Sequence, residues 1–238
     1  MCNRLGMITT VQGIEIKIKS FALEWWNFIR VPRNLINVVV SLFFLYLAYK
    51  ATMVAGVIAT KNAPVMGLKD LVLSNIPRYD TSFIHGPVSF FLYDMRWWLF
   101  LLFIRYTPFT AKALAALIFL RAITINLTSL GIPDEIVPTI AEATFGGDLF
   151  FSGHVANLFM LGLCFWPIKI LRYFFISMSI IFGVSALLGH YHYTIDVVAA
   201  PFFAYGVFII MKKIFKEDYM LISKSVISSK DGLNGMLK

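Results

Sequence analysis

His192 and Asp196 are four residues apart at the start of an apolar segment. On a helix, this spacing places both side chains on one face. The carboxylate can then accept a hydrogen bond from one ring nitrogen, which fixes the tautomer and leaves the other nitrogen as a base or nucleophile. A polar pair in a membrane helix is costly, so the pair predicts a chemical role over a merely structural one.

A second polar motif, Ser152-Gly153-His154, opens another apolar segment. Two histidines and an aspartate suit phosphoryl transfer without a metal. One histidine attacks phosphorus, and the other gives a proton to the leaving alkoxide. Zinc fits less well, because His190 and His192 do not share a helix face and no cysteine or further carboxylate completes a tetrahedral set. We therefore expect no metal and no cofactor.

A positive group must offset the charge on the transferred phosphoryl oxygens. Arg121 is the candidate, because it lies inside an apolar segment where an unpaired arginine is costly. The alternative is an ion pair with Glu135 or Asp148. Ser152 and Gly153 can cradle an anion with the N–H groups of the helix start, and Asp148 is a further candidate site residue.

These residues resemble motifs of the sphingomyelin synthase family, the lipid phosphotransferase branch of the type-2 phosphatidic acid phosphatase superfamily. Residues 147–154 and 192–196 are similar to its two signature motifs, and residues 121–133 to its arginine–threonine–leucine–proline segment. The resemblance covers roughly residues 110–215. It implies that His192 is the nucleophile, Asp196 its orienting partner and His154 the general acid and base.

The sequence also departs from these patterns. Ser185 is followed by Ala186, so the arginine that the wider superfamily carries there is absent, as is its upstream lysine–arginine–proline motif. In the sphingomyelin synthase branch, Arg121 would take over that role. Gly146 and Val155 stand where this branch usually has cysteine and threonine, which leaves the substrate open rather than the chemistry.

The elements that must position these residues are membrane helices. The chain has 238 residues, of which 59% are hydrophobic and only 14% charged, where a soluble domain would carry about 25% charged residues. We predict an all-α, polytopic fold with six transmembrane helices, at about 20 residues per span. The predicted spans are residues 35–59, 88–106, 110–128, 152–166, 173–188 and 193–214. Arg96, near the start of the second predicted span, is expected to be an interface anchor.

Basic residues gather before the first predicted span, in the turns after the second and fourth, and in the tail. The loop at 129–151 has acidic residues and neither lysine nor arginine. The positive-inside rule therefore predicts that both termini are cytoplasmic and that both histidine motifs lie at the extracytoplasmic face. We expect an interfacial segment at 1–34, a catalytic membrane domain at 35–215 and a basic cytoplasmic tail at 216–238. Lys50, inside the first span, is expected to snorkel or to face the bundle.

The predicted function is transfer of a phospho-head group, such as phosphocholine, from a glycerophospholipid to a lipid alcohol such as ceramide. Transfer to water, as in a lipid phosphate phosphatase or phospholipase C, uses the same residues and stays open. A non-enzymatic scramblase or transporter would not need His154, His192 and Asp196. The net charge of +8 follows from topology rather than from nucleic-acid binding. A bacterial inner membrane is favoured over a Golgi or plasma membrane, and the oligomeric state is open.

Overall fold

The computed structural model describes residues 22–64, 66–131, 133 and 148–222. Within these ranges the structure is helical and contains no strand. The chain divides into two units, residues 1–40 and 41–238. The helices are α2 (Pro32–Asn62), η1 (Leu73–Asn75), η2 (Ile84–Val88), α3 (Ser89–Leu102), α4 (Thr107–Leu127), α6 (Gly153–Cys164), α7 (Lys169–Leu188) and α8 (Thr194–Ile214).

Each predicted span coincides with one helix, but the helices differ in length. α2, α4, α7 and α8 have 20 to 31 residues and are long and apolar enough to cross a membrane. α6 is apolar but has 12 residues, and α3 has 14. The helical path into α3 begins earlier, because the π-helical turn η2 leads directly into it.

The first unit contributes a short helix at residues 22–29 and the start of α2, where the Asn34 amide donates to the Phe28 carbonyl oxygen over 3.1 Å. Most of the predicted interfacial segment lies outside the described residues. The same holds for most of the acidic loop before α6 and of the basic tail, of which residues 216–222 are helical.

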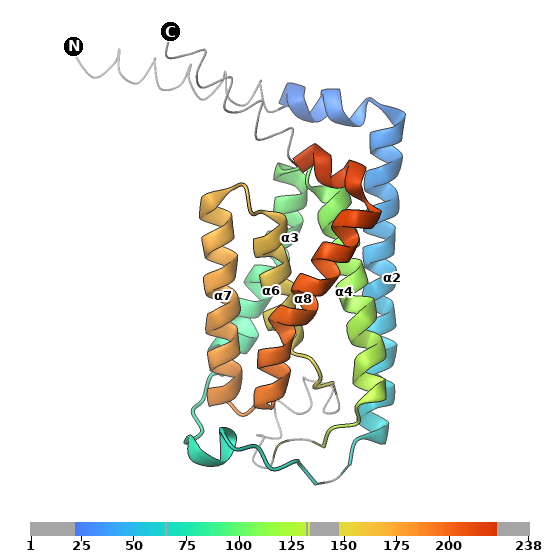
Figure 1. Ribbon diagram of the computed structural model, residues 1–238. Coiled ribbons are helices and arrows are strands. Elements are labelled where there is room, and N and C mark those ends of the chain that lie inside the picture. Colours follow the sequence, from blue (N-terminus) through green and yellow to red (C-terminus); the bar gives the residue numbers. More distant parts are fainter. Residues whose placement is uncertain (1–21, 65, 132, 134–147, 223–238) are drawn as a thin grey trace, which may run out of the picture. The chain divides into compact units, whose positions relative to one another are not determined.

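α6 lies at the centre of the second unit, flanked by α7 and α8 (Figure 1) and packed also against α4. Small residues make this close packing possible. Gly183 of α7 faces Val197 of α8, and a Cβ on this glycine would lie 3.0 Å from the valine Cγ1. Ala156 and Ala200 are completely buried. Phe203 of α8 stacks on Phe151 with ring centroids 4.6 Å apart, which fixes the chain just before α6.

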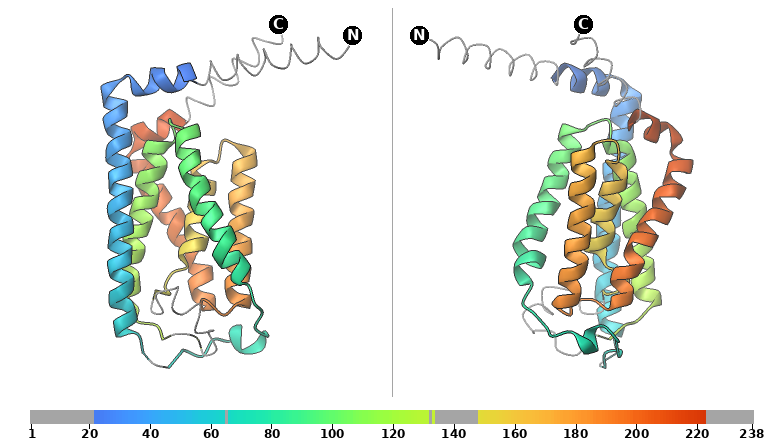
Figure 2. Two further views of the ribbon diagram at one scale, coloured as in Figure 1. Left: turned by 180° about the vertical axis from the view of Figure 1, so that it is seen from behind. Right: turned by 60° about the vertical axis from the view of Figure 1, so that its left-hand side comes forward.

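The outward faces of the long helices are apolar. Large side chains such as Phe202, Ile181 and Val54 are exposed there, as expected of surfaces that contact lipid. Figure 2 shows the same helices from behind and from the side. Lys50 is exposed and lies 5.5 Å from the Tyr46 ring centroid, so it faces outward and not into the bundle.

One predicted interface residue is placed differently. The sequence suggested that Arg96 anchors the start of its span at the membrane surface, but it is 4% exposed and lies inside the bundle. Its guanidinium is 5.1 Å from the ring centroids of Tyr49 and Tyr93. The sequence pattern does not reveal this, because Arg96 belongs to a helix with aromatic residues on both sides.

Candidate active site

The His192–Asp196 pair spans the beginning of α8 instead of lying within it. Tyr193 caps the helix, and its N–H donates to Asp196 Oδ2 over 3.0 Å. The same oxygen lies 3.4 Å from His192 Nδ1. The carboxylate is completely buried. One oxygen atom thus holds both the helix start and the imidazole, which directs His192 Nε2 away from α8 as the available nitrogen.

A backbone hydrogen bond joins the two histidine motifs. The Ser152 N–H donates to the Asp196 carbonyl oxygen over 3.1 Å, so α6 and α8 start side by side. His154, in the first turn of α6, is close enough to His192 to interact with it electrostatically. Its Nε2 lies 2.9 Å from Ser89 Oγ. Ser152 is the N-cap of α6, but its hydroxyl is buried and has no partner in the part of the chain that the structure describes.

His85, which the sequence did not single out, is the third imidazole of this cluster. Its ring centroid is 5.4 Å from that of His154 and 4.7 Å from that of Tyr191. Its Nε2 lies 3.1 Å from Ser185 Oγ. Because the Ser185 hydroxyl donates to the Phe182 carbonyl, it accepts from His85, which places the imidazole proton on Nε2.

Little in the sequence distinguishes His85. It belongs to a loop segment predicted on the same membrane side as the two motifs, but it has no spacing relation to them. The π-helical turn that holds it depends on contacts with α7.

Arg121 is paired, as the alternative interpretation proposed. Its Nη1 lies 2.6 Å from Asp148 Oδ1, Nη2 donates to the Asp148 carbonyl over 3.0 Å, and Nε donates to the Phe151 carbonyl over 2.7 Å. A Cβ on Gly153 would be 3.0 Å from Arg121 Nε. The glycine therefore allows the guanidinium to lie against the start of α6. Arg121 fixes the segment that carries His154, and Asp148 balances much of its charge. Glu135, the other possible partner, lies outside the described residues.

The loop after α2 holds the start of α8. The Asp70 carboxylate accepts from the Thr194 N–H over 2.7 Å and from the Thr194 hydroxyl over 2.9 Å. The Tyr193 hydroxyl donates to the Gly131 carbonyl over 2.7 Å and accepts from the Leu68 N–H, also over 2.7 Å. Tyr193 and Thr194, which lie between His192 and Asp196 in the chain, are therefore positioned by segments more than 60 residues away.

Of two cavities near the site, one is lined by His190 and the other by His154. A polar cavity of about 610 Å³ lies beside the loop after α2, with Lys69, Asp70, Arg78 and His190 in its wall. The other, of about 20 Å³, lies between α3, α6 and α7 and reaches His154. Within the described ranges, no group of three His, Cys, Asp or Glu is arranged to hold a metal ion.

The three predicted catalytic residues, His154, His192 and Asp196, thus lie together, and Ser152, Gly153, Arg121 and Asp148 surround the start of α6. A family model described as the PAP2 superfamily C-terminal domain matches residues 146–214. No curated protein and no solved structure is significantly similar to the chain. With its long apolar helices, the chain is an integral membrane protein. The match supports the type-2 phosphatidic acid phosphatase superfamily, which fits a lipid phosphatase or phosphotransferase, and it does not distinguish the sphingomyelin synthase branch.

Proposed function

We propose that the protein is a membrane-embedded lipid phosphotransferase that moves a phospho-head group from a glycerophospholipid to a lipid alcohol such as ceramide or diacylglycerol. The observation that carries the proposal is the hydrogen bond between Ser152 and Asp196, because it brings a histidine at the start of α6 to the histidine–aspartate pair at the start of α8. Two imidazoles at one phosphorus atom can act as nucleophile and as acid.

In the first step, His192 Nε2 attacks phosphorus while the bond from phosphorus to the glyceride oxygen breaks. His154 donates a proton to that oxygen, and diacylglycerol leaves. The head group stays on His192 as a phosphohistidine, and Asp196 stabilises the positive imidazole. In the second step, His154 takes the proton of the acceptor hydroxyl, whose oxygen attacks phosphorus and releases His192.

Hydrolysis is the second candidate, because water can replace the lipid alcohol in the second step. The polar cavity of about 610 Å³ would admit water. Lys69 and Arg78 in its wall also favour head groups with hydroxyl groups or negative charge, so phosphocholine is one donor among several to test.

For topology, we propose six spans, with both termini cytoplasmic and the histidines at the extracytoplasmic face. η2 and α3 together, and α6 with the chain before it, would form the two shorter crossings. A bacterial inner membrane remains the proposed location. Cysteine labelling of residues in the loop after α2, from either side of sealed vesicles, tests the orientation.

The enzymatic test uses purified full-length protein in mixed micelles. Donors with labelled head groups are phosphatidylcholine, phosphatidylethanolamine, phosphatidylglycerol and phosphatidic acid, each with and without ceramide or diacylglycerol. Transfer of label to the lipid alcohol by the wild type, but not by His192→Ala, supports a phosphotransferase. Release of soluble label alone makes the protein a hydrolase. Asp196→Asn should have strongly reduced activity. Its matched control is Asp94→Asn, because Asp94 is an exposed aspartate on α3. Equal behaviour of wild type and His192→Ala on every donor refutes an enzymatic role.

A further inference from the structure

The small cavity next to His154 lies where the proposed reaction places the lipid alcohol. In an in-line displacement the attacking and leaving atoms are on opposite sides of phosphorus. His192 attacks from one side, so the alcohol oxygen leaves on the other, where His154 gives it a proton. In the proposed reaction, the groups that line the cavity beside His154 therefore surround the rest of the alcohol. This inference rests on the proposed function.

The wall of this cavity combines apolar and polar side chains. Leucines of α3 and α6 and Phe182 form the apolar part, while Ser89, Tyr93, Arg96 and Asn157 contribute polar groups. Tyr93 is within hydrogen-bonding reach of Asn157. A volume of about 20 Å³ accommodates a group of the size of one water molecule or one carbonyl. It does not accommodate a sugar or a second phosphate.

Arg96 is the unusual member of this wall. It is 4% exposed at a depth where an arginine is expensive. Aromatic rings surround its guanidinium, and its Nε has no hydrogen-bond partner within the described part of the chain. No ion pair with a carboxylate is seen there either. A buried N–H donor without an acceptor is destabilising, so an acceptor that arrives with the substrate would relieve this cost.

We propose that this cavity binds the carbonyl group next to the reacting oxygen of the lipid alcohol, with Arg96 and Asn157 as the hydrogen-bond donors. A carbonyl oxygen is an acceptor only, and the guanidinium and amide N–H groups complement it. The substrate class is therefore an alcohol with an ester or amide within a few bonds of its hydroxyl, as in diacylglycerol or ceramide. Polyprenols and simple alkanols lack this group.

The experiment compares two donors that differ only in this carbonyl: the diacyl phospholipid and its 1-acyl-2-alkyl ether analogue, with the head group that the wild type turns over fastest. The readout is the ratio of kcat/KM for the diacyl lipid to kcat/KM for the ether lipid. Loss of a hydrogen bond to a charged donor lowers kcat/KM by about tenfold or more. We expect Arg96→Met and Asn157→Leu to lower the ratio by about tenfold relative to wild type, and Arg96→Lys, which keeps a donor, to lower it less.

Arg172→Met is the matched control, because Arg172 also lies against two aromatic rings, at 4.6 Å and 4.5 Å, but at the far end of α7. Its ratio should equal that of the wild type. His192-dependent turnover with one unchanged ratio in wild type and in the Arg96 and Asn157 variants overturns the carbonyl site and leaves the proposed function intact. If Arg96→Met does not fold, Asn157→Leu and Arg96→Lys decide the question. Turnover that is absent, or independent of His192, on both lipids refutes the proposed function, and the carbonyl site falls with it.

Discussion

Asp70 should help to position the site, through Thr194, although it does not touch the reacting atoms. Its carboxylate accepts four hydrogen bonds: from the N–H and hydroxyl of Thr194 over 2.7 Å and 2.9 Å, and from the N–H groups of Val72 and Leu73 over 2.8 Å and 3.2 Å. Thr194 is the first residue of α8 and lies two residues after His192. Asp70→Asn replaces one accepting oxygen by an NH₂ group that cannot accept from Thr194, and it removes a negative charge from the helix start.

The size of the effect follows from these bonds. Loss of one side-chain acceptor at a helix start typically costs about 1 kcal/mol. Because Asp70 is partly exposed, we expect a total of roughly 1–2 kcal/mol. This corresponds to a decrease in Tm of roughly 2–8 °C. If the loss falls on the arrangement of His192, kcat should decrease by about 5–30-fold.

The pH dependence of stability has a definite sign. Burial raises the pKa of the Asp70 carboxyl, but the hydrogen bonds from Thr194, Leu73 and Val72 outweigh it, so the pKa lies below its ordinary value of 3.8. A lowered pKa contributes stability above the unfolded-state value, and this contribution is lost as the pH falls through the folded-state value. Below about pH 4, the wild type should therefore approach Asp70→Asn.

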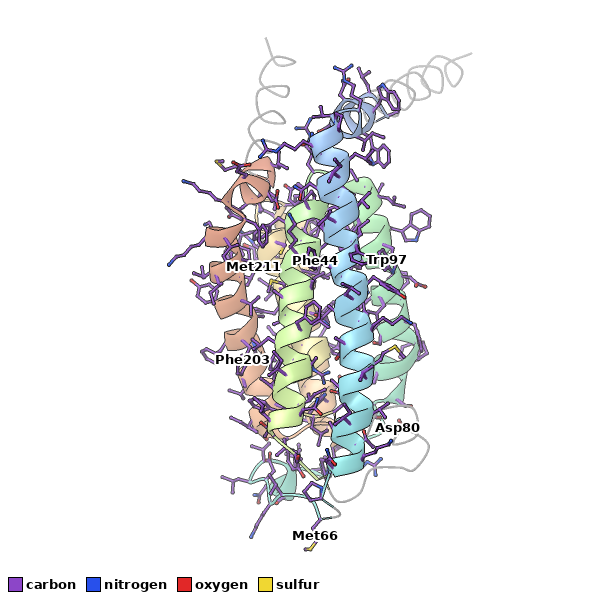
Figure 3. The ribbon with its side chains drawn as sticks, turned by 90° about the vertical axis from the view of Figure 1, so that its right-hand side faces the viewer. Phe44, Met66, Asp80, Trp97, Phe203 and Met211 are labelled. Atoms are coloured by element: carbon purple, nitrogen blue, oxygen red, sulfur yellow. The ribbon has the colours of Figure 1, made fainter. Side chains whose placement is uncertain are left out.

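The assay is Tm in detergent and kcat on the best donor, for wild type, Asp70→Asn and Asp80→Asn. Asp80, labelled in Figure 3, is a fully exposed aspartate of the same loop whose Oδ1 accepts from the Ser82 N–H over 2.9 Å. The substitution Asp80→Asn removes the same charge but does not affect a contact with α8. If Asp70→Asn and Asp80→Asn have the same Tm and kcat at neutral pH, the loop does not position the start of α8 and the reasoning fails.

Three further changes test the site. Gly153→Ala puts a Cβ 3.0 Å from Arg121 Nε and displaces a charged hydrogen bond, which costs about 1–3 kcal/mol. We therefore expect kcat to decrease by about 10–100-fold. An unchanged initial rate contradicts the contact. His85→Leu removes the hydrogen bond to Ser185 Oγ and should lower Tm, by an amount equivalent to about 1 kcal/mol; an unchanged Tm contradicts the contact. In Gly131→Ala, the new Cβ would overlap a backbone carbonyl of the loop after α2, so the variant should be destabilised by about 1–3 kcal/mol and have a lower Tm. Gly206→Ala is the control, because its Cβ has nothing within 4 Å and its Tm should not decrease. Equal Tm values of the two variants would contradict this.

Hydropathy was sufficient to place the helices, because long apolar runs and their charged ends depend on local sequence. The bounds of α4 and α8 differ from the predicted spans by only a few residues. The spacing of His192 and Asp196 also predicted their pairing, although His192 precedes the helix and the carboxylate additionally caps it.

The rest of the site depends on contacts between distant segments. His85 meets Ser185 across 100 residues, and Asp70 meets Thr194 across 124. No periodicity within one segment encodes such contacts. The prediction for Arg96 was wrong for a related reason. The hydropathy of α3 does not tell which of its faces is turned to the bundle. Only the packed structure shows that Tyr49 of α2 lies beside Arg96.

The π-helical turn η2 makes the site sensitive to chain length in one place. Its wider hydrogen-bonding pattern sets the angular offset between His85 and α3, and therefore between His85 and Ser89, the partner of His154. Pro87 lies inside this turn and has no N–H to donate, so the turn does not convert into an ordinary helix. Each residue of a helix turns the chain by about 100° and advances it by about 1.5 Å. Deleting one residue between His85 and Ser89 would therefore turn His85 away from the other imidazoles while α3 kept its full length. Insertions or deletions of the same size in the exposed loop before residue 70 would leave that angle unchanged.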